Sequence, residues 1–136
     1  MTKTETKIEI ARLSIKDAFE AEQGRRDAAR REKEDAELRQ QEEDLARAEE
    51  LEGALTADAD FLEAHELRLD RRRYTVSLDH ADFRIAAYFE VGKAAVTSAD
   101  KRIGHPGAAT PRKTEIVDTV ADALRVMAQY LADETR

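Results

Sequence analysis

Polar residues dominate the first half of the chain, and hydrophobic positions within it are sparse. Residues 20–56 consist mainly of charged residues, glutamine and alanine, and they contain no proline. Because these are strong helix formers, the stretch predicts one long helix that ends near Gly53. Opposite charges recur four positions apart, as in Glu22 with Arg26. Such pairs stabilise an exposed helix, so we expect its surface to be solvated.

The first twenty residues carry a weaker pattern. Ile8, Ala11, Ile15 and Phe19 share one face of a helix, whereas the sequence KIEI is also typical of the start of a strand. The spacing favours a helix that continues into the long one.

Hydrophobic residues gather in the second half of the long helix. Leu38, Leu45, Ala48, Leu51 and Leu55 form a seam with spacings of seven, three, three and four residues. This spacing resembles a short coiled-coil seam. Three interpretations remain open at this point. The leucines pack on the chain's own small domain, they pair with a second chain, or they belong to a solitary charged helix.

Residues 67–91 change to a period of two, which is typical of strands. Tyr74, Val76 and Leu78 share one face, and so do the odd-numbered apolar residues from Phe83 to Val91. The loop-forming DHAD at 79–82 lies between them, so the stretch predicts an antiparallel hairpin. The rival interpretation is a helix that begins at Asp82. A third strand is expected near KAAVTS.

The C-terminal stripe is the clearest helical pattern. Thr110 precedes Pro111, as a cap precedes the first helical residue. The stripe then follows at spacings of three and four: Val117, Val120, Leu124, Met127 and Leu131. This predicts an amphipathic helix over about 110–134.

Together these elements predict an α+β fold. Its parts are a long N-terminal charged helix, a small antiparallel β-hairpin or meander, and a C-terminal amphipathic helix. Residues 1–56 form the N-terminal helical segment, and residues 57–136 form a small α+β unit with its hairpin at about 67–91. Aromatic residues make up only 5% of the chain and 39% of residues are charged, which leaves little material for a core. We therefore expect a homodimer that shares its core.

Charge and composition narrow the function classes. The net charge is −7, and its excess lies in residues 22–52, which hold twelve acidic and seven basic residues. Bulk attraction to nucleic acid or to an anionic membrane is not supported. The absence of cysteine excludes disulfides, thiolate catalysis and cysteine zinc sites. No signal peptide or 18-residue apolar segment is visible, so we expect a cytoplasmic protein outside the membrane.

Two basic patches are candidate contacts for an anion or a nucleic acid. Arg71, Arg72 and Arg73 form the first, with the alternative that they line a polar turn or pair with the acidic helix. Arg112 and Lys113 form the second, near the expected N-terminus of the C-terminal helix, where free N–H groups favour anions. The alternative for this second patch is an ordinary capped helix.

No catalytic or metal-binding constellation emerges. His80 lies between Asp79 and Asp82, His65 follows Glu63, and His105 lies in a glycine-rich loop. Their spacing matches no metal or triad motif, so we expect no catalytic residue, no metal and no cofactor. An enzyme built on His80 with a neighbouring aspartate is the remaining alternative.

These features predict a non-enzymatic, homodimeric interaction or adaptor protein with a protein partner. We expect its dimer and partner surfaces to comprise Leu38, Leu45, Leu51, Leu55, Val117, Val120, Leu124, Met127 and Leu131. One alternative is a dimeric nucleic-acid-associated protein that uses the patches at 71–73 and 112–113. The other is a small acidic chaperone or inhibitor that masks a protein partner.

Overall fold

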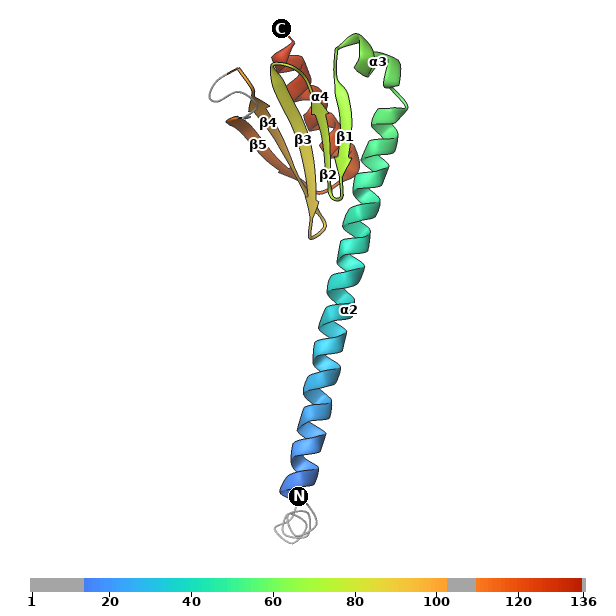
Figure 1. Cartoon of the computed structure of the whole chain (residues 1–136), viewed down its shortest axis with the longest axis vertical. Helices are drawn as coiled ribbons and strands as arrows, with labels where there is room; N and C mark the ends of the chain where they lie inside the picture. Colours follow the sequence, from blue (N-terminus) through green and yellow to red (C-terminus); the bar gives the residue numbers. More distant parts are fainter. Residues whose placement is uncertain (1–13, 103–109, 136) are drawn as a thin grey trace. The chain divides into compact units, whose positions relative to one another are not determined.

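The computed structural model describes residues 14–102 and 110–135, and it bears out the expected α+β class (Figure 1). The chain divides into two compact units, Met1–Leu38 and Arg39–Arg136. Helix α2 (Ile15–Thr56) contributes to both units. Residues 39–56 therefore belong to the same unit as the sheet, whereas the division expected from the sequence was at residue 56. The prediction for residues 1–13 lies outside the described residues.

The part of α2 in the first unit is polar on all sides. Every described side chain of residues 14–38 is exposed or half-exposed, including Ile15 and Phe19. The Ser14 hydroxyl accepts a hydrogen bond from the Asp17 backbone N–H (3.0 Å), which caps the helix start. Glu22 pairs with Arg25 (2.6 Å) and Arg26 (3.1 Å). These local ion pairs are the support expected for a helix with no buried face.

The second unit contains a five-stranded antiparallel meander of order β1-β2-β3-β4-β5. Its strands are β1 (Arg68–Arg72), β2 (Thr75–Asp79), β3 (Phe83–Glu90), β4 (Lys93–Asp100) and β5 (Thr110–Val117). The expected hairpin corresponds to β2 and β3, and β4 confirms the third strand. The rival helix from Asp82 is wrong, because the alternation of buried and exposed residues along β3 follows the period of a strand.

The predicted C-terminal helix over 110–134 was wrong in its first ten residues. Residues Thr110–Val117 form β5, and α4 spans only Val120–Glu134. Its cap is Thr119, whose hydroxyl accepts a hydrogen bond from the Asp122 backbone N–H (3.0 Å). Proline also fits near the start of an edge strand, so Thr110 followed by Pro111 does not by itself specify a helix.

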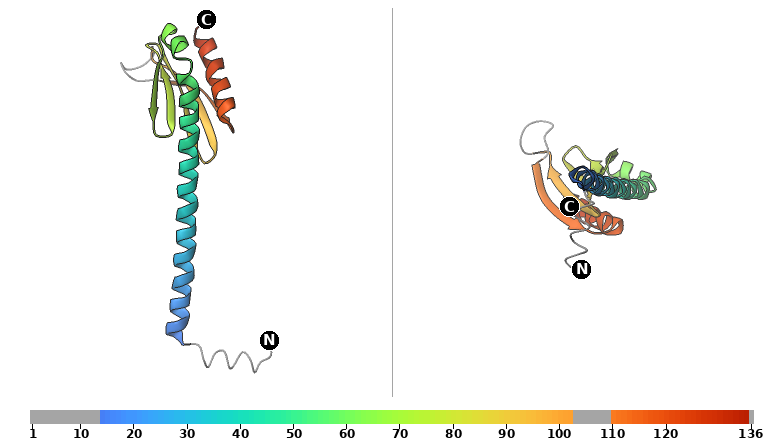
Figure 2. Two further views of the ribbon diagram at one scale, coloured as in Figure 1. Left: turned by 90° about the vertical axis from the view of Figure 1, so that its right-hand side faces the viewer. Right: turned by 90° about the horizontal axis from the view of Figure 1, so that it is seen from below.

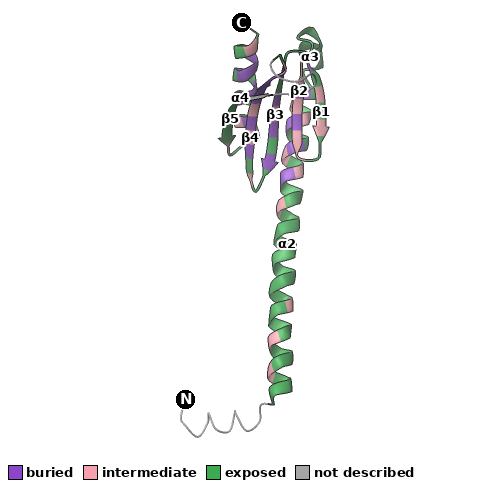
Figure 3. Cartoon of the chain, turned by 60° about the vertical axis from the view of Figure 1, so that its left-hand side comes forward, coloured by how far each residue is buried: buried purple, intermediate pink, exposed green. Residues whose placement is uncertain are grey.

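The core lies on one face of the sheet, against α4 and the last turns of α2 (Figures 2 and 3). The buried strand positions alternate, and register pairs them across strands: Val76 with Ala87, Leu78 with Ile85, and Phe89 with Ala94. Leu51 and Leu55 of α2 and Met127 and Leu131 of α4 complete this core. A short helix, α3 (Ala59–Ala64), follows α2 and adds Leu62.

A buried carboxylate attaches α2 to the β3–β4 turn. Asp44 is 5% exposed, and it accepts hydrogen bonds from the backbone N–H groups of Val91 (2.9 Å) and Gly92 (3.0 Å). Both turn residues have positive φ, 49° and 77°, as a tight two-residue hairpin turn requires. Gln40 and Arg47 donate to the same carboxylate at 3.2 and 3.3 Å. The turn N–H groups, which have no ladder partner, are thus satisfied by the helix.

Candidate functional site

The three arginines of the first basic patch each make a different contact. Arg71 Nε donates to Glu52 Oε1 of α2 (2.8 Å), which is the pairing with the acidic helix considered from the sequence. Arg72 Nε donates to Asp70 Oδ2 (3.2 Å). The Arg73 guanidinium lies 5.5 Å from the centre of the Tyr74 ring, in the β1–β2 turn. The three arginines therefore do not converge on one point.

The second basic patch is also engaged within the chain. Arg112 Nη1 donates to Glu134 Oε1 (2.9 Å), and Lys113 Nζ donates to Asp133 Oδ2 (2.7 Å). The predicted position of this patch at a helix N-terminus is wrong, because both residues lie on strand β5. The two patches lie on β1 and β5, the opposite edges of the sheet. They do not form a common surface.

The C-terminal end of α4 is attached to the sheet by an ion cluster with buried carboxylates and half-exposed arginines. Glu134 has a side chain only 8% exposed, and Arg102 Nη2 (3.0 Å) and Arg112 donate to it. Asp100 accepts hydrogen bonds from the backbone N–H (2.8 Å) and Nε (3.0 Å) of Arg102. These hydrogen bonds and the charges of Arg102 and Arg112 lower the pKa of Asp100. The cluster joins β4, β5 and α4, so its charges serve the fold.

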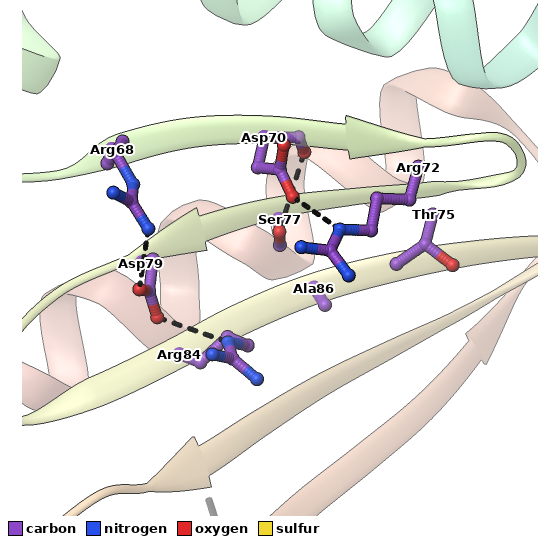
Figure 4. Close-up of a pocket in the computed structure, with 8 residues that line it drawn as sticks. All are labelled: Arg68, Asp70, Arg72, Thr75, Ser77, Asp79, Arg84 and Ala86. Atoms are coloured by element: carbon purple, nitrogen blue, oxygen red, sulfur yellow. Dashed lines mark hydrogen bonds and ion pairs between the residues drawn. The ribbon is translucent and has the colours of Figure 1, made fainter. Parts of the chain in front are cut away.

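The outer face of the sheet carries a shallow polar hollow of about 300 Å³ (Figure 4). Its lining comprises Arg68, Asp70, Arg72, Thr75, Ser77, Asp79, Arg84 and Ala86. Asp79 pairs with Arg84 (3.1 Å) and Lys101 (3.0 Å). Burial raises the pKa of Asp79, but the hydrogen bonds and charges of Lys101 and Arg84 outweigh it, and the net pKa is lowered. The carboxylates within the hollow thus neutralise much of its positive charge.

The two histidines within the described residues each pack against a phenylalanine ring. His80 stacks on Phe83 with 4.5 Å between ring centres, and its Nδ1 accepts a hydrogen bond from the Asp82 backbone N–H (3.0 Å). His65 lies against Phe61 with ring centres 4.3 Å apart. His105 lies outside the described residues. Within residues 14–102 and 110–135, no three histidine or carboxylate side chains are grouped to hold a metal ion.

The predicted interface residues fall into three environments. Leu51 and Leu55 are buried in the core of their own chain, as the first interpretation of the leucine seam expects. Met127 and Leu131 of the C-terminal stripe are buried in the same core. Leu45, Val117 and Val120 are half-buried. Leu38 and Leu124 are exposed, at 55% and 37%. Leu38 belongs to the first unit and Leu124 to the second.

An apolar hollow of about 270 Å³ opens around Leu124. We use this name for the space lined by Leu55, Asp58, Phe61, Leu62, Leu78, Leu124, Met127, Ala128 and Leu131. Helices α2, α3 and α4 and strand β2 all contribute to it. Phe61 is 49% exposed at its edge. Phe61 carries no signal in the sequence, because α3 is too short to show a helical period.

Among the described helices, none is long and apolar enough to cross a membrane. No protein-family model, curated protein or solved structure matches this chain.

Proposed function

We propose that this protein is a non-enzymatic, homodimeric interaction protein that binds an apolar segment of a protein partner in the apolar hollow. The observation that carries the proposal is the exposure of Phe61 and Leu124 beside the buried Met127 and Leu131. Two large exposed apolar side chains at the mouth of one hollow form a site where a further apolar side chain loses contact with water.

The size of the apolar hollow favours side chains of a protein over a small ligand. Its volume of about 270 Å³ lies just below the roughly 300–1,000 Å³ typical of small-molecule sites. It is also open to solvent between helices, which is the geometry in which an amphipathic helix places one or two apolar side chains. We therefore propose an amphipathic helix as the occupant.

The charges around the apolar hollow indicate the polar side of that helix. Asp58 lines the hollow, and the exposed Asp60 and Glu63 of α3 lie beside it in sequence. An acidic rim attracts a basic partner and repels an acidic one. The partner segment is thus proposed to be both apolar and basic.

Nucleic-acid binding has less support. Arg71, Arg72, Arg112 and Lys113 each form an ion pair within the chain, and the two groups lie on opposite edges of the sheet. A phosphate would have to compete with carboxylates already in place.

The test uses a synthetic amphipathic helical peptide of leucine and lysine, with a scrambled peptide of the same composition as reference. Fluorescence anisotropy is expected to show binding of the first peptide and at least tenfold weaker binding of the second. Leu124→Asp should weaken binding at least tenfold, because it places a charge in the mouth of the apolar hollow. Ile15→Asp is the matched control, since Ile15 is an exposed apolar residue outside the hollow. Equal binding by the Leu124→Asp variant would overturn the proposal.

A further inference from the structure

Strand β5 is an open edge of the sheet. It pairs with β4 on one side, and residues 112–116 are all exposed. An edge strand presents a row of N–H and C=O groups that can pair with another strand. Within the described part of the chain, no element other than β4 pairs with these residues.

We propose that two copies of the chain pair through β5 in antiparallel orientation, centred on Thr114, to form one continuous sheet. The inference rests on the homodimer in the proposed function and names its surface and register. A two-fold axis normal to the sheet places the same strand face of both copies on the same side. Directly opposed residues then share a face, as in any antiparallel pair.

The charges of β5 select the register. With Thr114 opposite the partner's Thr114, Lys113 lies opposite the partner's Glu115, and Glu115 lies opposite the partner's Lys113. The dimer thus gains two symmetric pairs of opposite charge and a central threonine pair, both of which are favourable cross-strand neighbours. Centring on Lys113 would oppose two lysines, and centring on Glu115 would oppose two glutamates. Only the Thr114 register among these three is free of like-charge contacts at its centre.

The side chains of β5 are available for this pairing. Glu115 has no hydrogen-bond or ion-pair partner among the described residues. Lys113 pairs with Asp133, yet its side chain remains 47% exposed at the strand edge. Ile116 is 60% exposed on the outer face of the sheet. There it lines a hollow together with Tyr88, Val91 and Ala95.

The other edge of the sheet is less suited to self-pairing. In the register that pairs all five residues of β1, Asp70 would face the partner's Asp70, and Arg68 would face the partner's Arg72. Each of these contacts opposes like charges, which destabilises a strand pair. The comparison favours β5 as the edge between two copies.

The first experiment reverses charges on β5 and measures the dimer dissociation constant by analytical ultracentrifugation. Glu115→Lys should weaken the dimer at least tenfold, because it sets lysine opposite lysine. The double change Lys113→Glu with Glu115→Lys should bring the dissociation constant back toward the wild-type value, because opposite charges again face each other. Glu49→Lys, an exposed change of the same charge on α2, is the matched control and should leave it unchanged. A double variant as weak as Glu115→Lys would overturn the register.

The second experiment uses the absence of cysteine from the chain. Directly opposed residues have Cα atoms about 4.5–5.5 Å apart, which is within the range of disulfides. Thr114→Cys should therefore form a disulfide with residue 114 of the second copy on mild oxidation, because the two residues lie opposite each other at the centre of the strand pair. Arg72→Cys, on the opposite edge, is the control and should remain a free thiol.

The outcomes separate this inference from the proposed function. A monomer at all accessible concentrations, with no cross-link at residue 114, would overturn both the edge pairing and the homodimer. A dimer whose dissociation constant does not change with the charge reversals, and in which Thr114→Cys forms no disulfide, would overturn the edge pairing alone. Peptide binding at the apolar hollow would be untouched by either result.

Discussion

Replacing Asp44 by alanine tests how α2 is attached to the sheet. The Asp44 carboxylate satisfies the backbone N–H groups of Val91 and Gly92, at 2.9 and 3.0 Å, and also pairs with Arg47. Alanine removes all of these contacts without a steric conflict. Ala48 and Leu51, which follow on the same helix and are fully buried, would remain.

The expected loss of stability in Asp44→Ala follows from the contacts that the substitution removes. A hydrogen bond to a charged group contributes roughly 1.5–3 kcal/mol to the free energy of unfolding. Losing two such bonds would lower the free energy of unfolding by at most about 3–6 kcal/mol. The real loss is smaller, because water can reach the exposed turn and form hydrogen bonds with the freed N–H groups. Alanine also favours a helix over aspartate by roughly 0.5 kcal/mol. We therefore expect a loss of about 2–3 kcal/mol, which is a large part of the roughly 5–15 kcal/mol of a typical domain.

Urea denaturation followed by tyrosine fluorescence is the suitable assay. All three tyrosines lie in the second unit and the chain has no tryptophan, so the signal reports this unit and not the exposed part of α2. A loss of this size corresponds to a fall in melting temperature of roughly 10–20 °C. Asp44→Asn should be intermediate, because one amide oxygen can still accept from the turn.

Glu43→Ala provides the control on the same helix. Glu43 is exposed and has no hydrogen-bond or ion-pair partner among the described residues, so its loss should change stability by less than about 0.5 kcal/mol. A loss below that value for Asp44→Ala would refute the view that this carboxylate holds the turn.

Three further predictions concern the turn, the acidic side chains and the ion cluster. Val91→Asn should raise the unfolding free energy by about 0.5–1 kcal/mol in the same assay, because Val91 has φ of 49°, where a β-branched residue is strained and asparagine is not. The lowered pKa values of Asp79 and Asp100 should make stability fall as pH drops through those folded-state values, while their contribution is fully present above the unfolded pKa of about 4. Urea midpoints from pH 7 to pH 2 should show this loss, and a double Asp79→Asn and Asp100→Asn variant should flatten the profile. Glu134→Gln should destabilise the second unit, because it removes the negative charge of the carboxylate with which Arg102 and Arg112 both pair. The matched change Glu63→Gln, on an exposed side chain of α3, should have no measurable effect on the urea midpoint.

The elements with the strongest local pattern could be predicted from the sequence. The helix formers of residues 20–56 predicted α2, which begins at Ile15 and ends at Thr56. The period-two alternation predicted β2 and β3, because each of these strands buries alternate residues. The third strand expected near KAAVTS corresponds to β4. These patterns depend on residues close together in the chain, so local reasoning is sufficient for them.

The stretch from Thr110 to Val117 shows where local reasoning failed. Its proline, its β-branched residues and the spacing of Val117 and Val120 fit both the start of a helix and an edge strand. What decides is the pairing with β4, which runs along β5 with one register shift between Ser98 and Ala99. That pairing joins residues 10 to 23 positions apart, from Asp100 with Thr110 to Ala94 with Val117, so the pattern within β5 does not contain it.

The candidate site depended on tertiary structure for the same reason. The sequence determined which residues were apolar, including Leu124, Met127 and Leu131, but not which of them the chain would bury itself. It placed five basic residues in two patches, but not the carboxylates of Glu52, Asp70, Asp133 and Glu134 that pair with them. A local pattern records the chemistry of each side chain. Glu52, Asp133 and Glu134 lie 19 to 22 positions from the basic residues that they pair with, and only folding brings these groups together.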